Sequence, residues 1–110
     1  MRHSTLCSGE LRLEFYPDRD LAYATVSADG DFEDRPAVTC DPDALRAVLN
    51  GKPHHIAGNG WICSMGLTEG TVDVDLWRDG QKPKRCRVPV NEYEHALTEA
   101  FGTRSQAYAV

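Results

Sequence analysis

Apolar and polar residues follow the same order twice along this chain. Each half begins with short segments in which every second residue is apolar, the pattern of a strand with one buried face. Each half then continues into a segment with apolar residues three and four positions apart, the pattern of an amphipathic helix, and ends in a glycine. The helical segments span residues 41–51 and 91–102. Neither half is long enough to bury its own apolar face, so the two halves should share one core.

Three strands are predicted in the first half, at residues 11–16, 21–28 and 37–40. If residues 17–20 form the first loop, Phe15 pairs with Ala22 and Leu13 pairs with Ala24. Residues 29 and 30, Asp-Gly, favour a tight hairpin turn because both prefer a positive φ. Pro36 lacks a backbone donor, so the third strand should lie at an edge or a bulge.

Three more strands are predicted in the second half, at residues 61–67, 72–77 and 85–90. A loop at residues 78–82 pairs Val74 with Cys86 on the inner face. The same register sets Asp75 opposite Arg85 and Asp73 opposite Arg87 on the outer face. Both faces therefore agree on one register, which favours structural ion pairing for these aspartates over a catalytic role.

The helix boundaries are marked by capping residues. In the first helix Asp41 is expected at the N-cap, Pro42 at the first helical position and Gly51 at the end. The second helix is expected to start at Asn91, with Glu94 as its capping-box partner, and to end at Gly102. The buried stripes are expected to contain Leu45, Val48 and Leu49 in the first helix and Tyr93, Ala96, Leu97, Ala100 and Phe101 in the second.

These elements predict an α+β protein with an antiparallel sheet in βββ-α-βββ-α order and two helices packed on one face. The alternative is that the strands curl into a half-open barrel that the helices plug. Residues 1–102 are expected to form a single domain, with repeat units at about residues 8–51 and 58–102, followed by a flexible tail at residues 103–110.

Composition is that of an ordinary globular protein, with 41% hydrophobic and 26% charged residues in a chain of 110. We expect a cytoplasmic protein, because no apolar run is long enough for a membrane helix and the N-terminus lacks the apolar core of a secretory signal. The net charge of −5 argues against nucleic acid as a partner. Residues 29–43 carry six acids and one base, whereas residues 78–87 carry five bases and one acid. This asymmetry could guide a charged partner or a second copy of the chain.

Cysteine and histidine provide the main candidates for ligand chemistry. Cys7, Cys40, Cys63 and Cys86 are too widely spaced for a structural zinc knuckle, so buried free thiols are favoured over disulfides and over a metal site. His54 and His55 are expected in a loop, where they could bind a ligand, although neighbouring side chains in an extended segment point to opposite sides. No metal or cofactor is therefore assigned.

No catalytic signature is found. Ser64 lacks the glycine two residues ahead that a nucleophile elbow requires, and no base can be assigned to it. Gly58, Asn59 and Gly60 lack the third glycine and the lysine of a phosphate-binding loop. No catalytic residue is proposed, and an enzyme of unrecognised type is the least favoured of the hypotheses.

The favoured hypothesis is a non-enzymatic protein-interaction or regulatory module of immunity, inhibitor or adaptor type, by analogy of architecture alone. Its partner is expected to be a protein, with self-association into a homodimer left open. The expected contact residues are Tyr16, Tyr23, Trp77, Arg78, Lys82, Lys84, Arg85 and Arg87, because exposed aromatic residues framed by charges are favoured at interfaces. The alternative is a ligand- or metal-binding protein that uses His54, His55 and Trp61 together with the strand cysteines.

Overall fold

The computed structural model describes residues 4–6, 10–17, 22–28 and 36–102. The chain forms two antiparallel sheets of four strands and two helices, which confirms the α+β class. Sheet A has the order β1-β2-β3-β4 and sheet B the order β5-β6-β7-β8. Each half therefore forms its own four-stranded sheet. The sequence had predicted three strands from each half, all in one shared sheet. The strands are β1 (Ser4–Leu6), β2 (Leu11–Tyr16), β3 (Tyr23–Ala28), β4 (Val38–Cys40), β5 (His54–Gly58), β6 (Trp61–Thr68), β7 (Thr71–Trp77) and β8 (Lys84–Pro89).

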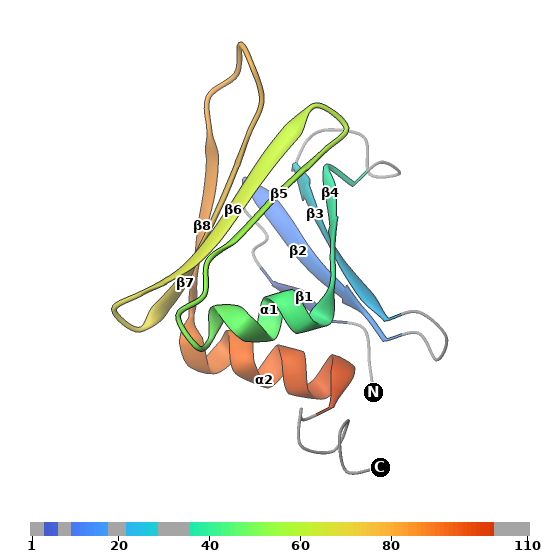
Figure 1. Ribbon diagram of the computed structural model, residues 1–110, viewed down its shortest axis with the longest axis vertical. Helices are drawn as coiled ribbons and strands as arrows, with labels where there is room; N and C mark the ends of the chain where they lie inside the picture. The colour runs from blue at the N-terminus through green and yellow to red at the C-terminus, as the bar shows by residue number, and fades with distance from the viewer. Residues whose placement is uncertain (1–3, 7–9, 18–21, 29–35, 103–110) are drawn as a thin grey trace.

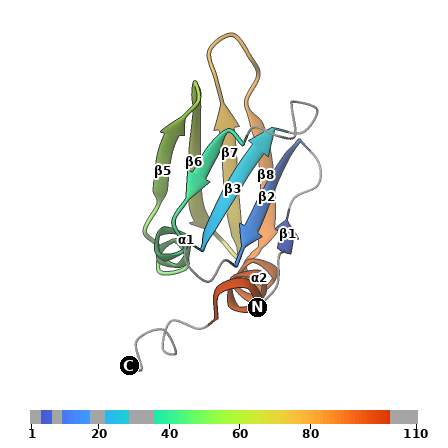
Figure 2. The same ribbon diagram turned by 90° about the vertical axis from the view of Figure 1, so that its right-hand side faces the viewer.

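The helices are α1 (Pro42–Val48), between the two sheets in the chain, and α2 (Val90–Phe101), after the second. The sheets lie face to face, lean together near β4 and the β5–β6 turn, and diverge toward the other end, where both helices lie (Figure 1). Figure 2 shows sheet A in front of sheet B, with α1 beside β4 and β5. The helices thus fill the open end between two sheets, and the strands do not close into a barrel. No helix in the described ranges is long and apolar enough to cross a membrane.

The core lies between the inner faces of the sheets and the buried sides of the helices. Phe15 of β2 is fully buried, and its ring meets Tyr93 edge-on at 6.4 Å and Phe101 at 5.5 Å between centroids. The hydroxyl of Tyr93 donates to the backbone oxygen of Leu45 over 2.7 Å, which satisfies a buried carbonyl of the other helix. Sheet A, α1 and α2 are therefore joined at one point by packing and by a buried hydrogen bond.

The two predicted registers had different outcomes. In the β7–β8 hairpin the structure pairs Val74 with Cys86 and Asp75 with Arg85, as predicted. In the β2–β3 hairpin Phe15 pairs with Ala24, and the predicted pairing with Ala22 is wrong by two residues. The loop is longer than the four residues assumed, and Tyr16 pairs with Tyr23 at its base. A shift of two preserves the buried face, so the expected alternation survives the error.

Capping follows the prediction in α1 and departs from it in α2. The side chain of Asp41 accepts a hydrogen bond from the backbone N–H of Asp43, and Pro42 opens α1. Pro89 occupies the N-cap of α2, and no side chain caps it, so the capping box predicted at Asn91 is wrong. The first free N–H, of Val90, donates to the backbone oxygen of Gly70 instead. A turn of sheet B thus replaces the missing cap.

Strands β1 and β5 were not predicted. β5 was assigned to a loop, yet it pairs with β6 along its whole length and lies against β4. Gly58 permits this close approach, because a Cβ atom there would lie 3.2 Å from the backbone oxygen of Ala37. Asn59 Nδ2 donates to the backbone oxygen of Pro36 over 3.0 Å and secures the same seam. The predicted turn at residues 29 and 30, the predicted tail and Cys7 lie outside the described residues.

Candidate functional site

The outer faces of the two sheets point away from each other, because their buried faces meet in the core (Figure 2). Tyr16 and Tyr23 lie on the outer face of sheet A, whereas Trp77, Arg85 and Arg87 lie on the outer face of sheet B. The residues expected to form one contact surface are therefore divided between opposite sides of the molecule.

On the outer face of sheet A, the described side chains of β3 are stacked or buried. The rings of Tyr16 and Tyr23 stack with centroids 5.0 Å apart and planes 19° apart. Thr25 and Ser27, on the same face, are only 6% and 5% exposed. Burial, followed by the nearby charge of Glu14, raises the pKa of the Tyr16 hydroxyl. These side chains leave little apolar surface for a partner.

The outer face of sheet B carries an exposed apolar patch. Ile62 of β6 is 44% exposed and is the direct cross-strand partner of Trp77 on β7 and of Ala57 on β5. Ile62, Trp77 and Ala57 are called the apolar patch below. The sequence identified Trp77 but not Ile62, because the pairing register between β6 and β7 was not predicted.

Two rows of charge lie beside the apolar patch, and they confirm the predicted cross-strand pairs. Arg85 Nε lies 3.2 Å from Asp75 Oδ1, and Arg87 Nε lies 3.6 Å from Asp73 Oδ1. The hydroxyl of Thr71 also donates to Asp73 Oδ1 over 2.8 Å. These two ion pairs are called the charged rows below. They order the arginine side chains along β8 while leaving them exposed.

Arg78 and Trp61 are occupied within the chain. The Arg78 guanidinium lies 4.2 Å from the centre of the Trp61 ring and donates to the backbone oxygen of Asn59 over 3.2 Å. Trp61 is 4% exposed on the inner face of sheet B. Lys82 lies exposed in the β7–β8 turn, and Lys84 is partly buried at the start of β8.

The neighbouring histidines point to opposite sides of β5, as expected for an extended segment. His55 is exposed, and its Nδ1 lies 2.9 Å from Ser64 Oγ on β6. His54 is partly buried, and its Nε2 has no hydrogen-bond partner among the described residues. Burial, with a smaller effect of His55, lowers the pKa of His54, whereas Asp41 acts in the opposite direction. His54 lines a pocket of about 370 Å³ with Lys52, Pro53 and the first turns of α1.

The Ser64–His55 pair was missed because β5 had been assigned to a loop. An activated serine requires a group that orients its base and donors for the developing oxyanion. The nearest acid in the strand register is Asp75, which lies opposite Ser64 and forms an ion pair with Arg85. In the described part of the chain, no carboxylate hydrogen-bonds to His55. The pair is therefore arranged as a cross-strand hydrogen bond on an open face.

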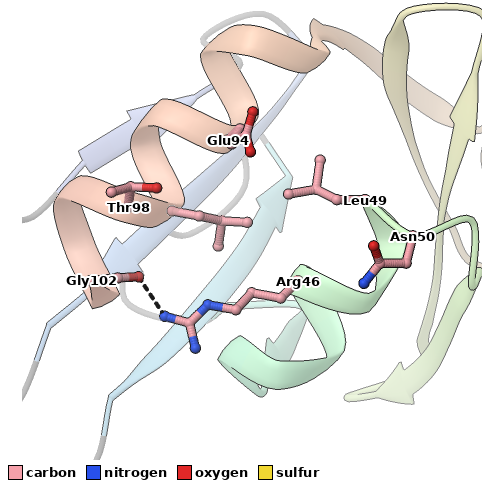
Figure 3. A pocket seen from close by; sticks show the side chains of 7 residues that line it. Arg46, Leu49, Asn50, Glu94, Thr98 and Gly102 are labelled. Carbon is pink, nitrogen blue, oxygen red and sulfur yellow. Dashed lines mark hydrogen bonds between the residues drawn. The ribbon is translucent and has the colours of Figure 1, made fainter. Parts of the chain in front are cut away.

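A second pocket, of about 310 Å³, lies between the helices (Figure 3). Arg46 of α1 reaches across its end and donates from Nη2 to the backbone oxygens of Phe101 and Gly102, over 3.0 and 2.7 Å. These carbonyls end α2 and would otherwise lack partners. The pocket walls also include Leu49, Glu94 and Thr98. Arg46 thus caps the C-terminal end of α2.

The cysteines differ in state. Cys40 and Cys63 are free and buried on the inner faces, and burial raises the pKa of each thiol to about 12. Cys86 is disulfide-bonded, so the expectation of a free thiol is wrong for this residue. Within the described ranges, no three side chains of histidine, cysteine, aspartate or glutamate come together as a metal site.

Comparison of the chain with protein-family models, with curated proteins and with solved structures finds no match.

Proposed function

We propose that this protein is a non-enzymatic interaction module that binds a protein partner through the outer face of sheet B. The observation that carries the proposal is the exposure of Ile62, at 44%, directly beside Trp77. Protein interfaces favour an aromatic anchor at the centre, apolar neighbours and a polar rim. The apolar patch and the charged rows have this arrangement on one continuous face.

The comparison between the two outer faces supports the choice of side. On sheet A the tyrosines stack on each other, and the hydroxyl residues beside them are buried. On sheet B the apolar patch is open to solvent. Gly66, four residues after Ile62 on β6, also has no atom within 4 Å of the position that a Cβ would take. A partner would therefore displace more water from sheet B than from sheet A.

Charge also favours the face of sheet B. The β7–β8 hairpin, residues 71–89, carries five bases (Arg78, Lys82, Lys84, Arg85 and Arg87) and three acids (Asp73, Asp75 and Asp79), a net charge of +2, whereas the whole chain carries −5. A local excess of one sign accelerates association with a partner of the opposite sign. An acidic partner, or the acidic surface of a second copy, would be steered to this hairpin.

The experiment is affinity capture from native extract with three baits. Wild type is compared with Ile62→Asp on sheet B and with Thr39→Asp, an exposed position on the outer face of sheet A. We expect Ile62→Asp to lose a partner that wild type and Thr39→Asp both retain, with circular dichroism confirming that all three baits are folded. Equal retention by all three would contradict the proposed surface. Sedimentation of the purified protein tests self-association in parallel.

The cytoplasmic location stays a prediction. The disulfide at Cys86 is more typical of an oxidising compartment. Cell fractionation followed by detection of the protein with an antibody would distinguish the cytoplasm from an oxidising compartment.

A small-molecule site beside His54 is the second candidate. It is favoured by a pocket of about 370 Å³ and by the unpartnered Nε2 of His54 within the described residues. His55 and Trp61 do not line this pocket. A thermal-shift screen of small metabolites would support this function if a stabilising compound lost its effect in His54→Phe, and the absence of any stabilising compound would count against it.

A further inference from the structure

Arg85 and Arg87 present two guanidinium groups on the same side of β8. The residues are two positions apart in a strand, so their Cα atoms are separated by about 7 Å and both side chains project outward. Their side chains are 74% and 77% exposed. Asp75 and Asp73 on β7 contact them through Nε, so the aspartates fix the arginines without covering them.

Each guanidinium keeps hydrogen-bonding capacity beyond its aspartate. Arginine has five N–H donors in a planar fork, and one carboxylate accepts two of them at most, so about three remain. Within the described residues neither side chain has a second ion pair or hydrogen bond. Two forks at a fixed spacing are therefore open toward solvent.

We propose that Arg85 and Arg87 bind an extended acidic segment of the partner, with carboxylates on alternate residues and an apolar residue at the next alternate position. The proposal rests on the function proposed above and specifies the partner's chemistry. An extended chain repeats its side chains on one side every two residues, at the spacing of the two arginines. Trp77 lies two residues beyond Asp75 on the neighbouring strand β7, so the apolar patch begins at the next register position, one strand away from the forks. The recognised order is acidic, any, acidic, any, apolar.

The segment is expected to run over the outer face of sheet B, parallel to β8, without pairing with the backbone at the edge of the sheet. The backbone N–H of Arg85 points away from β7 and donates to Glu10 Oε2 over 3.1 Å, so a partner strand cannot use it. Pro89 lacks a backbone donor at the end of β8. The edge of sheet B is thus protected where the arginine side chains are most exposed.

An acidic peptide fits this surface better than nucleic acid does. Phosphates also pair with arginine forks, but a chain with a net charge of −5 repels a long polyanion. The apolar patch next to the forks offers an exposed apolar surface for an aliphatic side chain. A short peptide carries both required features.

The test is fluorescence anisotropy with a labelled peptide of about ten residues that contains Glu-Ser-Glu-Ser-Leu in an extended, serine-rich context. The matched peptide has the same composition with its glutamates adjacent. The protein variants are the double substitution Arg85→Lys with Arg87→Lys, which keeps the charge and removes the forks, and Lys52→Ala, which removes an exposed charge from the loop after α1 and keeps the forks.

We expect the alternating peptide to bind, the matched peptide to bind at least about fivefold more weakly, and the double lysine variant to lose about fivefold to tenfold in affinity. Lys52→Ala should change affinity by less than about twofold at 0.15 M salt. Equal affinity of wild type and the double lysine variant, equal binding of both peptides, or tighter binding of a labelled oligothymidylate would each overturn the inference.

Failure of this inference is distinguishable from failure of the proposed function. If Ile62→Asp loses its captured partner while neither peptide binds, the acidic segment is wrong and the interaction surface stands. If Ile62→Asp captures the same proteins as wild type, both proposals are wrong.

Discussion

The two halves of the molecule have the same order of elements but different roles. The first half closes its own outer face with the stacked Tyr16 and Tyr23, and supplies Phe15 to the centre of the core. The second half builds a larger sheet and leaves Ile62 and the charged rows exposed. A repeated chain order therefore does not imply repeated function, because the outer face of a sheet is free to diverge once the inner face is filled.

The largest expected effect tests this division directly. Phe15→Ala should lower the free energy of unfolding by about 3 to 5 kcal/mol, because it leaves a cavity between α2 and sheet A. Trp77→Ala on the outer face of sheet B should cost much less. Urea denaturation measures both. The comparison between the halves fails if the two substitutions are equally destabilising.

The link between the halves is expected to have a smaller but substantial effect. Arg46→Met removes two hydrogen bonds to the last carbonyls of α2 and should cost about 1 to 3 kcal/mol. Arg87→Met removes one exposed ion pair and should cost less than about 1 kcal/mol. Thermal unfolding distinguishes the two arginines, and an equal loss would show that Arg46 does not hold α2.

Glycine substitutions compare the seam with the open face. Gly58→Ala places a methyl group 3.2 Å from the backbone oxygen of Ala37, which cannot rotate away, so the variant should lose about 1 to 2 kcal/mol. Gly66→Ala meets no atom and should be neutral or slightly stabilising. Chemical denaturation provides the measurement. If Gly58→Ala has the same free energy of unfolding as wild type, β4 and β5 are not in close contact.

The smallest expected effect is a pH dependence that comes from His54. Because burial lowers its pKa below the ordinary 6.5, the unfolded chain takes up this proton at a higher pH than the folded chain does. Stability should therefore decrease as the pH falls from about 7 through 6.5 toward the folded pKa. His54→Asn should flatten this slope, whereas His95→Asn, on the exposed side of α2, should keep it. A slope unchanged in His54→Asn would assign the effect to another group.

The sequence predicted those parts of the fold in which two independent signals agree. The β7–β8 register was right because apolar pairing of Val74 and charge pairing of Asp75 require the same alignment. The β2–β3 register was wrong because only loop length specified it. β5 was missed because Ile56 is its only large apolar residue, and its pairing with β6 and its contact with β4 are tertiary effects.

The candidate site was predicted only in part for the same reason. Arg85, Arg87 and their aspartates were placed together by the hairpin pattern. Ile62 joins Trp77 through the β6–β7 register, and Arg78 is held by Trp61 through a contact between strands. Neither contact leaves a local pattern in the sequence. Tyr16 was assigned to the same surface because sequence reasoning assumed one sheet where the protein has two.

The reach of Arg46 across the helix pair has a consequence for cooperativity. Its guanidinium belongs to α1, but the carbonyls that it satisfies belong to the last residue of α2 and to the C-cap Gly102, 55 and 56 positions along the chain. Detachment of either helix leaves partly buried polar groups without partners on the other, so the two should open as one unit. Amide hydrogens in both helices should therefore report a common free energy of opening in hydrogen exchange, and neither half of the chain should fold when expressed alone.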